Sequence, residues 1–243
     1  MAIDYRQVIE NETHAMAATV AGHPVETRVP GCPDWNLGEL AIHLGQVQRW
    51  ATGILAAAEP PTTYTPPPEH DGSEPADYLL AGLGPLLTAI DDADLTAPTW
   101  TFVRTEQTKA FWLRRQAMEV ATHRWDADHA VGLPTSLAAD VAADSIDEYV
   151  HLMMPRIIGR TKADLGSLVG DVHIHCTDID GEWTFDVHNG ALRVTKGHGK
   201  ASTAVRGRAS DVALFLYNRL PAEHVEIFGD HDLLAAWRSI LRF

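Results

Sequence analysis

Residues 36–58 read NLGELAIHLGQVQRWATGILAAA, and this stretch decides the fold of the N-terminal half of the chain. Asn36 stands directly before the first apolar residue and Glu39 follows three residues later, which is typical of a capping box at a helix start. Apolar residues then recur at spacings of three and four, as one buried helix face requires: Leu37, Leu40, Leu44, Val47, Ala51 and Ile54. We therefore predict an amphipathic helix from residue 37 to about residue 58.

Three further stretches space their apolar residues like helices: residues 4–20, 76–90 and 109–130. Gly84-Pro85 predicts a kink within the second of these helices. The proline-rich residues 59–75 have little to bury and predict an exposed connection. Four helices joined by such connections predict an antiparallel four-helix bundle, which we assign to a domain of residues 1–134.

After Pro134 the pattern changes from helices alone to helices and strands. Residues 137–158 predict one more helix, and residues 171–206 alternate apolar and polar side chains in short runs, as strands do. Helical spacing then returns at residues 211–219 and 230–241. We therefore predict a C-terminal domain of residues 135–243 with helices packed on a small antiparallel sheet, and a two-domain α+β fold for the chain.

The composition excludes several classes of partner. The chain has 243 residues with 19 Lys and Arg against 33 Asp and Glu, a net charge of −14. Such a charge argues against binding to nucleic acid or to an anionic membrane surface. Because there is no signal peptide, no apolar run of about 20 residues and too few cysteines for a disulfide scaffold, we expect a soluble cytoplasmic protein. Of the partner classes considered, a small-molecule substrate is the one that the composition allows. The sequence does not determine the oligomeric state.

Histidines are numerous, and two of them are placed for metal binding. His43 points toward the bundle interior or its edge, because it shares a helix face with four apolar residues: Leu40, Val47, Trp50 and Ile54. Alone it is an ordinary core histidine, but Glu119 and His123 lie four residues apart on another predicted helix and share one face. Together the three residues form a set of two imidazoles and one carboxylate, as in catalytic zinc and non-haem iron sites. The alternative is an ordinary Glu–His pair on a solvated face.

Other histidines and both cysteines favour plainer roles. His173 and His175 lie two residues apart on a predicted strand, so both point to one face and could bind metal. We favour the polar face of a half-exposed strand instead. Cys32 precedes a helix without a basic neighbour in sequence, and we interpret it and Cys176 as structural.

Three arginines concentrate around one predicted helix of the second domain: Arg206, Arg208 and Arg219. In an otherwise acidic chain they could bind a carboxylate. The plainer alternative is that at least two of the three are ordinary surface residues.

Two N-terminal motifs resemble a known family. Residues 30–35 (PGCPDW) followed by residues 40–44 (LAIHL) form the first, and residues 111–126 (FWLRRQAMEVATHRWD) form the second. They resemble the mycothiol-dependent maleylpyruvate isomerases, which belong to the DinB-like metal-dependent thiol transferases. Residues 173–230 are similar to the C-terminal domain of that family, which is related to sterol carrier folds.

The resemblance implies a divalent metal, most often zinc, on His43, Glu119 and His123, and a catalytic arginine at Arg219, with Arg206 or Arg208 as alternatives. Asp126 is a candidate to orient a metal ligand. The implied cofactor is mycothiol or a similar low-molecular-weight thiol. In an isomerase, this thiol would add to an activated cis double bond, the resulting single bond would rotate, and the thiol would be expelled to leave the trans product. In a transferase, the thiol would stay on the electrophile.

The chain is thus expected to be an isomerase or S-transferase for a small electrophilic substrate that bears a carboxylate. One alternative is a non-catalytic protein that binds a small molecule or lipid. Another is a metal-dependent hydrolase of thiol conjugates, for which the sequence offers no clear base.

Overall fold

Helix α2 (Leu37–Ala56) begins at the capping box that the sequence predicts, in a computed structural model that describes residues 2–59 and 61–241. The Asn36 side chain accepts from the backbone N–H of Glu39 at 2.9 Å, and the Glu39 carboxylate accepts from the backbone N–H of Asn36 at 2.8 Å. These bonds satisfy N–H groups that have no partner inside the helix. The sequence thus sets the residue at which α2 starts.

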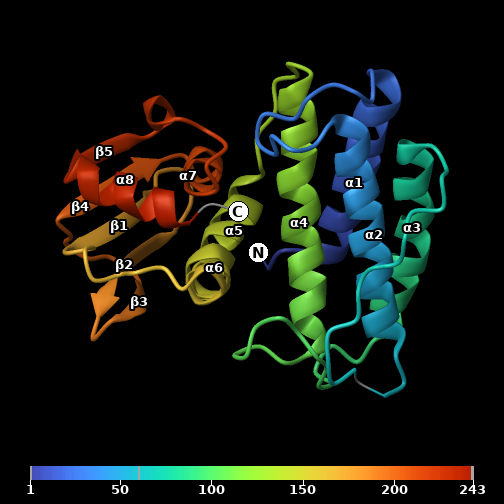
Figure 1. Ribbon diagram of the computed structural model, residues 1–243, viewed down its shortest axis with the longest axis horizontal. Helices are drawn as coiled ribbons and strands as arrows, with labels where there is room; N and C mark the ends of the chain where they lie inside the picture. The colour runs from blue at the N-terminus through green and yellow to red at the C-terminus, as the bar shows by residue number, and fades with distance from the viewer. Residues whose placement is uncertain (1, 60, 242–243) are drawn as a thin grey trace. The chain divides into compact units, whose positions relative to one another are not determined.

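The N-terminal unit, Met1–Thr135, is the predicted four-helix bundle. Helices α1 to α4 lie side by side in Figure 1. Besides α2, the bundle consists of α1 (Tyr5–Gly22), α3 (Pro75–Asp91) and α4 (Lys109–Ala130). The prediction for α4 matches both of its ends, and Pro85 lies inside α3 as expected.

Helix α4 differs from its neighbours because it buries several polar side chains: Gln116, His123, Asp126 and Asp128. Burial of a polar or charged group costs free energy unless the group is hydrogen bonded or paired. Asp128 has such partners, since it accepts from the Thr19 hydroxyl at 2.6 Å and from Arg124 at 3.0 Å. A helix that carries this many buried polar groups marks where a site is built into the bundle.

The C-terminal unit, Ser136–Phe243, opens with a helical segment that is less regular than predicted. In place of one helix over residues 137–158, α5 (Ala139–Glu148) passes through a π-helical turn (Tyr149–Met153) into α6 (Met154–Thr161). Pro155 at the start of α6 has no N–H to donate, so the regular α-helical bonding cannot run through this point.

A five-stranded sheet follows, in the order β3-β2-β1-β4-β5. The strands are β1 (Asp171–Cys176), β2 (Glu182–His188), β3 (Ala191–Lys196), β4 (Thr203–Gly207) and β5 (Glu226–Gly229). The predicted α+β class is confirmed, with one difference: β4 pairs with β1 in parallel, and the other three pairs are antiparallel. The sheet is mixed because β4 joins the free edge of β1 and not the neighbouring strand β3.

Helices cover the apolar face of this sheet. Val172, Ile174, Trp183 and Phe185 are buried on it. The two remaining helices are α7 (Ala209–Leu216) and α8 (His231–Ile240). Trp237 of α8 packs edge to face on Phe185 with ring centroids 5.2 Å apart, and α8 lies across the strands in Figure 1.

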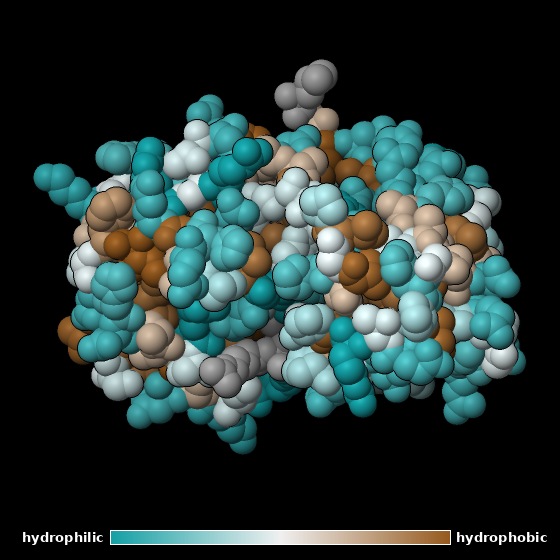
Figure 2. All heavy atoms as spheres, turned by 90° about the horizontal axis from the view of Figure 1, so that it is seen from above, coloured by the Kyte–Doolittle hydropathy of each residue, from teal (hydrophilic) through white to brown (hydrophobic). Residues whose placement is uncertain are grey.

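Hydrophilic side chains cover much of the face drawn in Figure 2, with smaller hydrophobic areas among them. This is the distribution expected of a chain with 33 acidic residues. Within residues 2–59 and 61–241, no helix combines the length and the apolar character that crossing a bilayer demands.

Asp147 of α5 ties that helix to the sheet, and we predict that its removal destabilises the C-terminal unit. Its carboxylate accepts from the indole N–H of the buried Trp183 at 2.9 Å and from Lys196 at 2.9 Å. Asp147→Ala leaves the indole N–H without its acceptor, so the free energy of unfolding should fall by about 1–3 kcal/mol. Asp147→Asn keeps an acceptor oxygen and should cost less. Urea denaturation measures both, and equal midpoints for all three proteins would contradict the prediction.

The same contact predicts a pH dependence. Burial alone would raise the pKa of the Asp147 carboxyl, but the bonds from Trp183 and Lys196 outweigh burial and lower that pKa below its ordinary value. A carboxyl with a lowered folded-state pKa stabilises the fold above the unfolded pKa of about 4 and loses this effect as the pH falls. The difference in the free energy of unfolding between wild type and Asp147→Ala should therefore become smaller as the pH falls below about 4, as urea denaturation at several pH values would measure.

Candidate metal centre

The three side chains expected to bind metal come together inside the bundle. His43 lies on α2, and Glu119 and His123 lie one turn apart on α4. One ligand atom from each residue lies within 4.8 Å of the other two. The capped start of α2 and the four-residue spacing on α4 together bring these residues to one place.

The Glu119 carboxylate is the centre of the group. Its Oε1 lies 3.2 Å from Nε2 of His43 and 3.5 Å from Nε2 of His123. The two imidazole rings meet edge to face, with centroids 5.5 Å apart. Two ring nitrogens and one carboxylate oxygen thus converge from two helices, which is a donor set that suits Zn²⁺ and leaves coordination positions open.

Arg115 keeps the Glu119 carboxylate ionised. It lies one turn before Glu119 on α4 and donates to Oε2, the oxygen that faces away from the imidazoles. Burial alone would raise the pKa of Glu119, but Arg115, together with His123 and His43, holds that pKa well below its ordinary value. Glu119 therefore presents a negative charge to the two imidazoles at neutral pH.

Asp126 orients His123 from the opposite side of the ring. Its Oδ2 lies 2.9 Å from Nδ1 of His123. Burial alone would lower the pKa of His123, but Asp126, then Cys32 and Glu119, raise it well above its ordinary value. A metal ion would take the place of the proton on Nε2, while Asp126 holds the proton on Nδ1, as in carboxylate–histidine–metal arrangements. The residues therefore fit a divalent metal ion.

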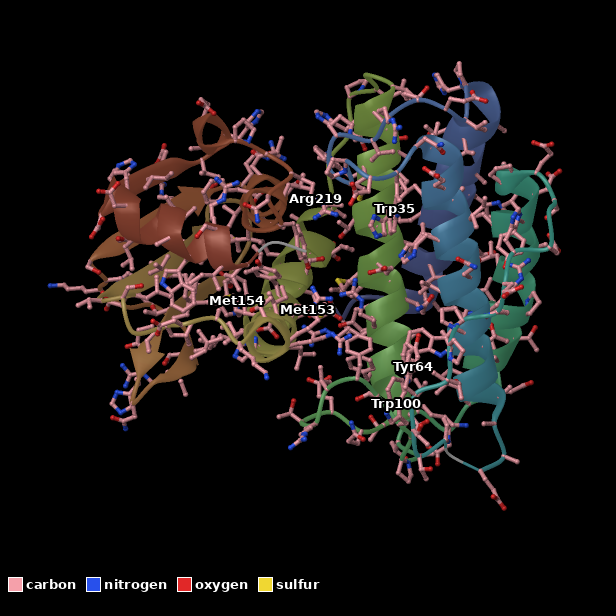
Figure 3. The ribbon with its side chains drawn as sticks, viewed as in Figure 1. Trp35, Tyr64, Trp100, Met153, Met154 and Arg219 are labelled. Carbon is pink, nitrogen blue, oxygen red and sulfur yellow. The ribbon has the colours of Figure 1, made fainter. Side chains whose placement is uncertain are left out.

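The loop before α2 supplies two neighbours that the sequence analysis did not assign to the site. Cys32 Sγ lies 3.6 Å from Asp126 Oδ2, and the Trp35 ring lies 4.6 Å from the His43 ring. Trp35 points from this loop toward α4 in Figure 3. A tight turn, with the N–H of Trp35 donating to the carbonyl of Cys32 at 2.8 Å, brings both residues to the cluster. Residues in a turn carry no periodic signal, so only the fold reveals this placement.

An aromatic cluster continues from the metal cluster along the same helix faces. Trp50 lies seven residues beyond His43, Trp112 lies seven residues before Glu119, and their rings are 4.9 Å apart. Tyr64 and Trp100 complete the cluster at the end of the bundle where α2 ends and α4 begins (Figure 3). Among the described residues, neither Trp50 Nε1 nor Nε2 of the buried Gln116 has a hydrogen-bond partner. Both are buried N–H donors whose hydrogen-bonding capacity is unused within the described residues.

The three candidate arginines of the C-terminal unit have different surroundings. Arg206 on β4 pairs with Glu226 at 2.8 Å, and Arg208 lies 3.5 Å from Asp178. Arg219 lies beyond the end of α7, because α7 stops at Leu216 and not at residue 219 as predicted. The half-buried Arg219 guanidinium donates to the carbonyl of Tyr217 at 2.8 Å, and Figure 3 shows it within the C-terminal unit.

Sequence and structure comparisons agree with one another. The sequence model for the mycothiol maleylpyruvate isomerase N-terminal domain matches residues 8–128, and that for the SCP-2 sterol transfer family matches residues 156–242. No curated protein sequence matches the chain.

Two solved structures have a similar fold. Both are crystal structures of mycothiol-dependent maleylpyruvate isomerase, one of them a histidine-to-alanine mutant. The mutant aligns with a TM-score of 0.62 at 8% identity, and the other with a TM-score of 0.61 at 10% identity. Each alignment covers 92% of this chain and 91% of the other. The two family models show that the chain joins an N-terminal domain of the mycothiol maleylpyruvate isomerase family to a C-terminal domain of the SCP-2 sterol transfer family, and the solved structures share this fold.

Proposed function

We propose that this chain is a metal- and thiol-dependent enzyme that isomerises a small electrophilic substrate or transfers a thiol to it. The observation that carries the proposal is the convergence of His43, Glu119 and His123 on one point between α2 and α4. Family membership supports the same reaction class. We further propose that the enzyme acts in the cytoplasm, where low-molecular-weight thiols stay reduced.

Each side chain of the cluster has its own task in this proposal. His43, Glu119 and His123 hold a divalent ion, for which Zn²⁺ is the best match. When bound, this ion would hold mycothiol or a similar thiol as its thiolate near pH 7. Arg115 keeps Glu119 ionised, and Asp126 fixes the ring of His123. The aromatic cluster and the N–H groups of Gln116 and Trp50 form a surface for the substrate.

We propose that Arg219 binds a carboxylate of the substrate and stabilises the negative charge that develops on an adjacent enolate oxygen. The support is the resemblance of residues 173–230 to the C-terminal domain of the family, which implies a catalytic arginine at Arg219.

One competing function has a specific observation in its favour. The match to the SCP-2 sterol transfer family over residues 156–242 supports the binding of an apolar ligand without chemistry. A hydrolase of thiol conjugates is less favoured, because this proposal uses Glu119 as a ligand, and Asp126, the other carboxylate beside the cluster, is engaged with Nδ1 of His123. Binding of a thiol to the metal separates the proposed enzyme from both.

The first test of the proposal removes one ligand. His43→Ala should lower the bound Co²⁺ by about one equivalent per chain and abolish the thiolate-to-cobalt absorption that mycothiol induces in the wild type. His14→Ala removes an exposed histidine of α1 and should change neither quantity. Elemental analysis and an absorption titration give the two readouts. Unchanged metal content and an unchanged thiol spectrum in His43→Ala would refute the metal site.

The second prediction concerns Asp126 as a positioning residue. Asp126→Ala should weaken metal binding by roughly 10- to 100-fold, because His123 loses the partner that fixes its ring. Competition with a chromophoric chelator measures the affinity. Asp128→Ala is the matched control, because it removes a buried carboxylate of α4 that contacts Thr19 and Arg124 instead of His123. Equal metal affinity in Asp126→Ala and Asp128→Ala would show that Asp126 does not position His123 for metal binding.

The third prediction concerns Arg219, tested with maleylpyruvate and mycothiol as the probe pair. Arg219→Ala should lower kcat/KM by roughly 10- to 150-fold, the worth of a hydrogen bond to a charged group, and leave metal content unchanged. Arg206→Ala and Arg208→Ala should retain activity. If either of these variants loses activity while Arg219→Ala does not, the carboxylate-binding role belongs to the other arginine.

A further inference from the structure

A second group of imidazoles gathers on the sheet of the C-terminal unit. The pairing of β1 with β2 places His173 opposite Thr184 and His175 opposite Glu182. Side chains alternate between the two faces of a strand, so these four residues share one face. Val172 and Ile174 occupy the other face, which packs on the helices. The polar cluster is therefore separated by the sheet from the apolar core.

Glu182 is the point on which this second group converges. Its Oε2 lies 3.0 Å from His173 Nε2 and 2.8 Å from His198 Nδ1, and its Oε1 lies 3.4 Å from His175 Nδ1. One ligand atom each of His173, His175 and Glu182 lies within 4.8 Å of the other two. In a tetrahedral zinc site with bonds of about 2.0–2.1 Å, neighbouring ligand atoms are about 3.3 Å apart. The separations between Glu182 and the imidazoles of His173 and His175, 3.0 and 3.4 Å, are close to that spacing.

His173 has the environment of an oriented ligand. It is only 6% exposed, and Nδ1 lies 3.0 Å from the Thr184 hydroxyl. With a proton on Nδ1 directed at that hydroxyl, Nε2 turns its lone pair toward Glu182. A hydrogen-bond partner on the far ring nitrogen is the usual companion of a metal-bound histidine.

The remaining members leave the cluster open to solvent on one side. The side chains of His175 and His198 are 34% and 81% exposed, so an ion has a route in. His198 follows β3, and the N–H of Gly197 donates to the Glu182 carbonyl at 2.8 Å, which holds this connection beside β2. Arg206 is the cation beside His175 on β4, and its charge is compensated by Glu226 at 2.8 Å.

We propose that His173, His175 and Glu182 bind a divalent transition-metal ion of the Zn²⁺ type, and that the exposed His198, which lies outside this three-residue group and contacts Glu182, turns toward the ion as a fourth ligand. The site is separate from the one on α2 and α4, since all of its ligands lie on β1, β2 and the connection after β3. It does not depend on the function proposed for the first site. Its ligands come from three consecutive segments of the sheet, so the ion stabilises the C-terminal unit by joining them.

The test uses the untagged full chain, stripped of metal with a chelator and then saturated with Co²⁺. Wild type should retain about two ions per chain after gel filtration and elemental analysis, and His175→Ala/His198→Ala should retain about one. His188→Ala is the matched control, because it removes an exposed histidine from the far end of β2. Its content should equal that of wild type. His175→Gln/His198→Gln should reproduce the loss and guards against a folding defect in the alanine variant.

Thermal unfolding gives a readout that is independent of stoichiometry. In a His43→Ala background, Co²⁺ should still raise the Tm, and the added His175→Ala/His198→Ala changes should abolish that rise. If wild type binds one ion that His43→Ala removes, the second site does not exist. If it binds one ion that only His175→Ala/His198→Ala removes, the second site stands and the first fails. Equal Co²⁺ content in wild type and His175→Ala/His198→Ala would likewise overturn the inference.

Discussion

The carboxylate of Glu119 is the constraint on which the N-terminal unit depends. A carboxylate inside a helical bundle destabilises the fold unless partners compensate its charge, and here Arg115 holds one oxygen while His43 and His123 approach the other. His43 can contact Glu119 only if α2 has one particular axial position relative to α4. The capping box at Asn36 fixes where α2 begins, so a local backbone signal sets the geometry of a contact between residues 76 positions apart.

The predictable part of this site is the part encoded by helical periodicity. Glu119 and His123 share a face by spacing alone, and His43 follows from the apolar stripe of its own helix. Cys32 and Trp35 have no such signal, because their placement results from a turn whose direction depends on tertiary packing. Arg115 is also four residues from Glu119, but a charged residue at that spacing is equally compatible with a solvated surface. Periodicity thus predicts ligands better than it predicts the groups that support them.

The C-terminal unit shows the corresponding limit for strands. Alternation places His173 and His175 on one face, but it cannot say which residue of another strand stands opposite, because register depends on the turn and on the partner. Glu182 becomes part of the cluster only through the pairing of β1 with β2. The parallel β1–β4 pair and the short strand β5 escape prediction for the same reason, since both depend on contacts distant in sequence. A pair of histidines that fits a polar strand face in sequence is thus part of a larger group in the fold.

Charge distribution limits how a chain of this composition can bind an anionic substrate. With a net charge of −14, the long-range field repels a carboxylate, so binding has to come from short-range contacts with a cation whose own charge is not already compensated. Glu226 and Asp178 lie beside Arg206 and Arg208, and the Arg219 guanidinium donates to the carbonyl of Tyr217. Binding of a carboxylate at Arg219 would therefore depend on direct hydrogen bonds to the guanidinium and not on the long-range field of the chain.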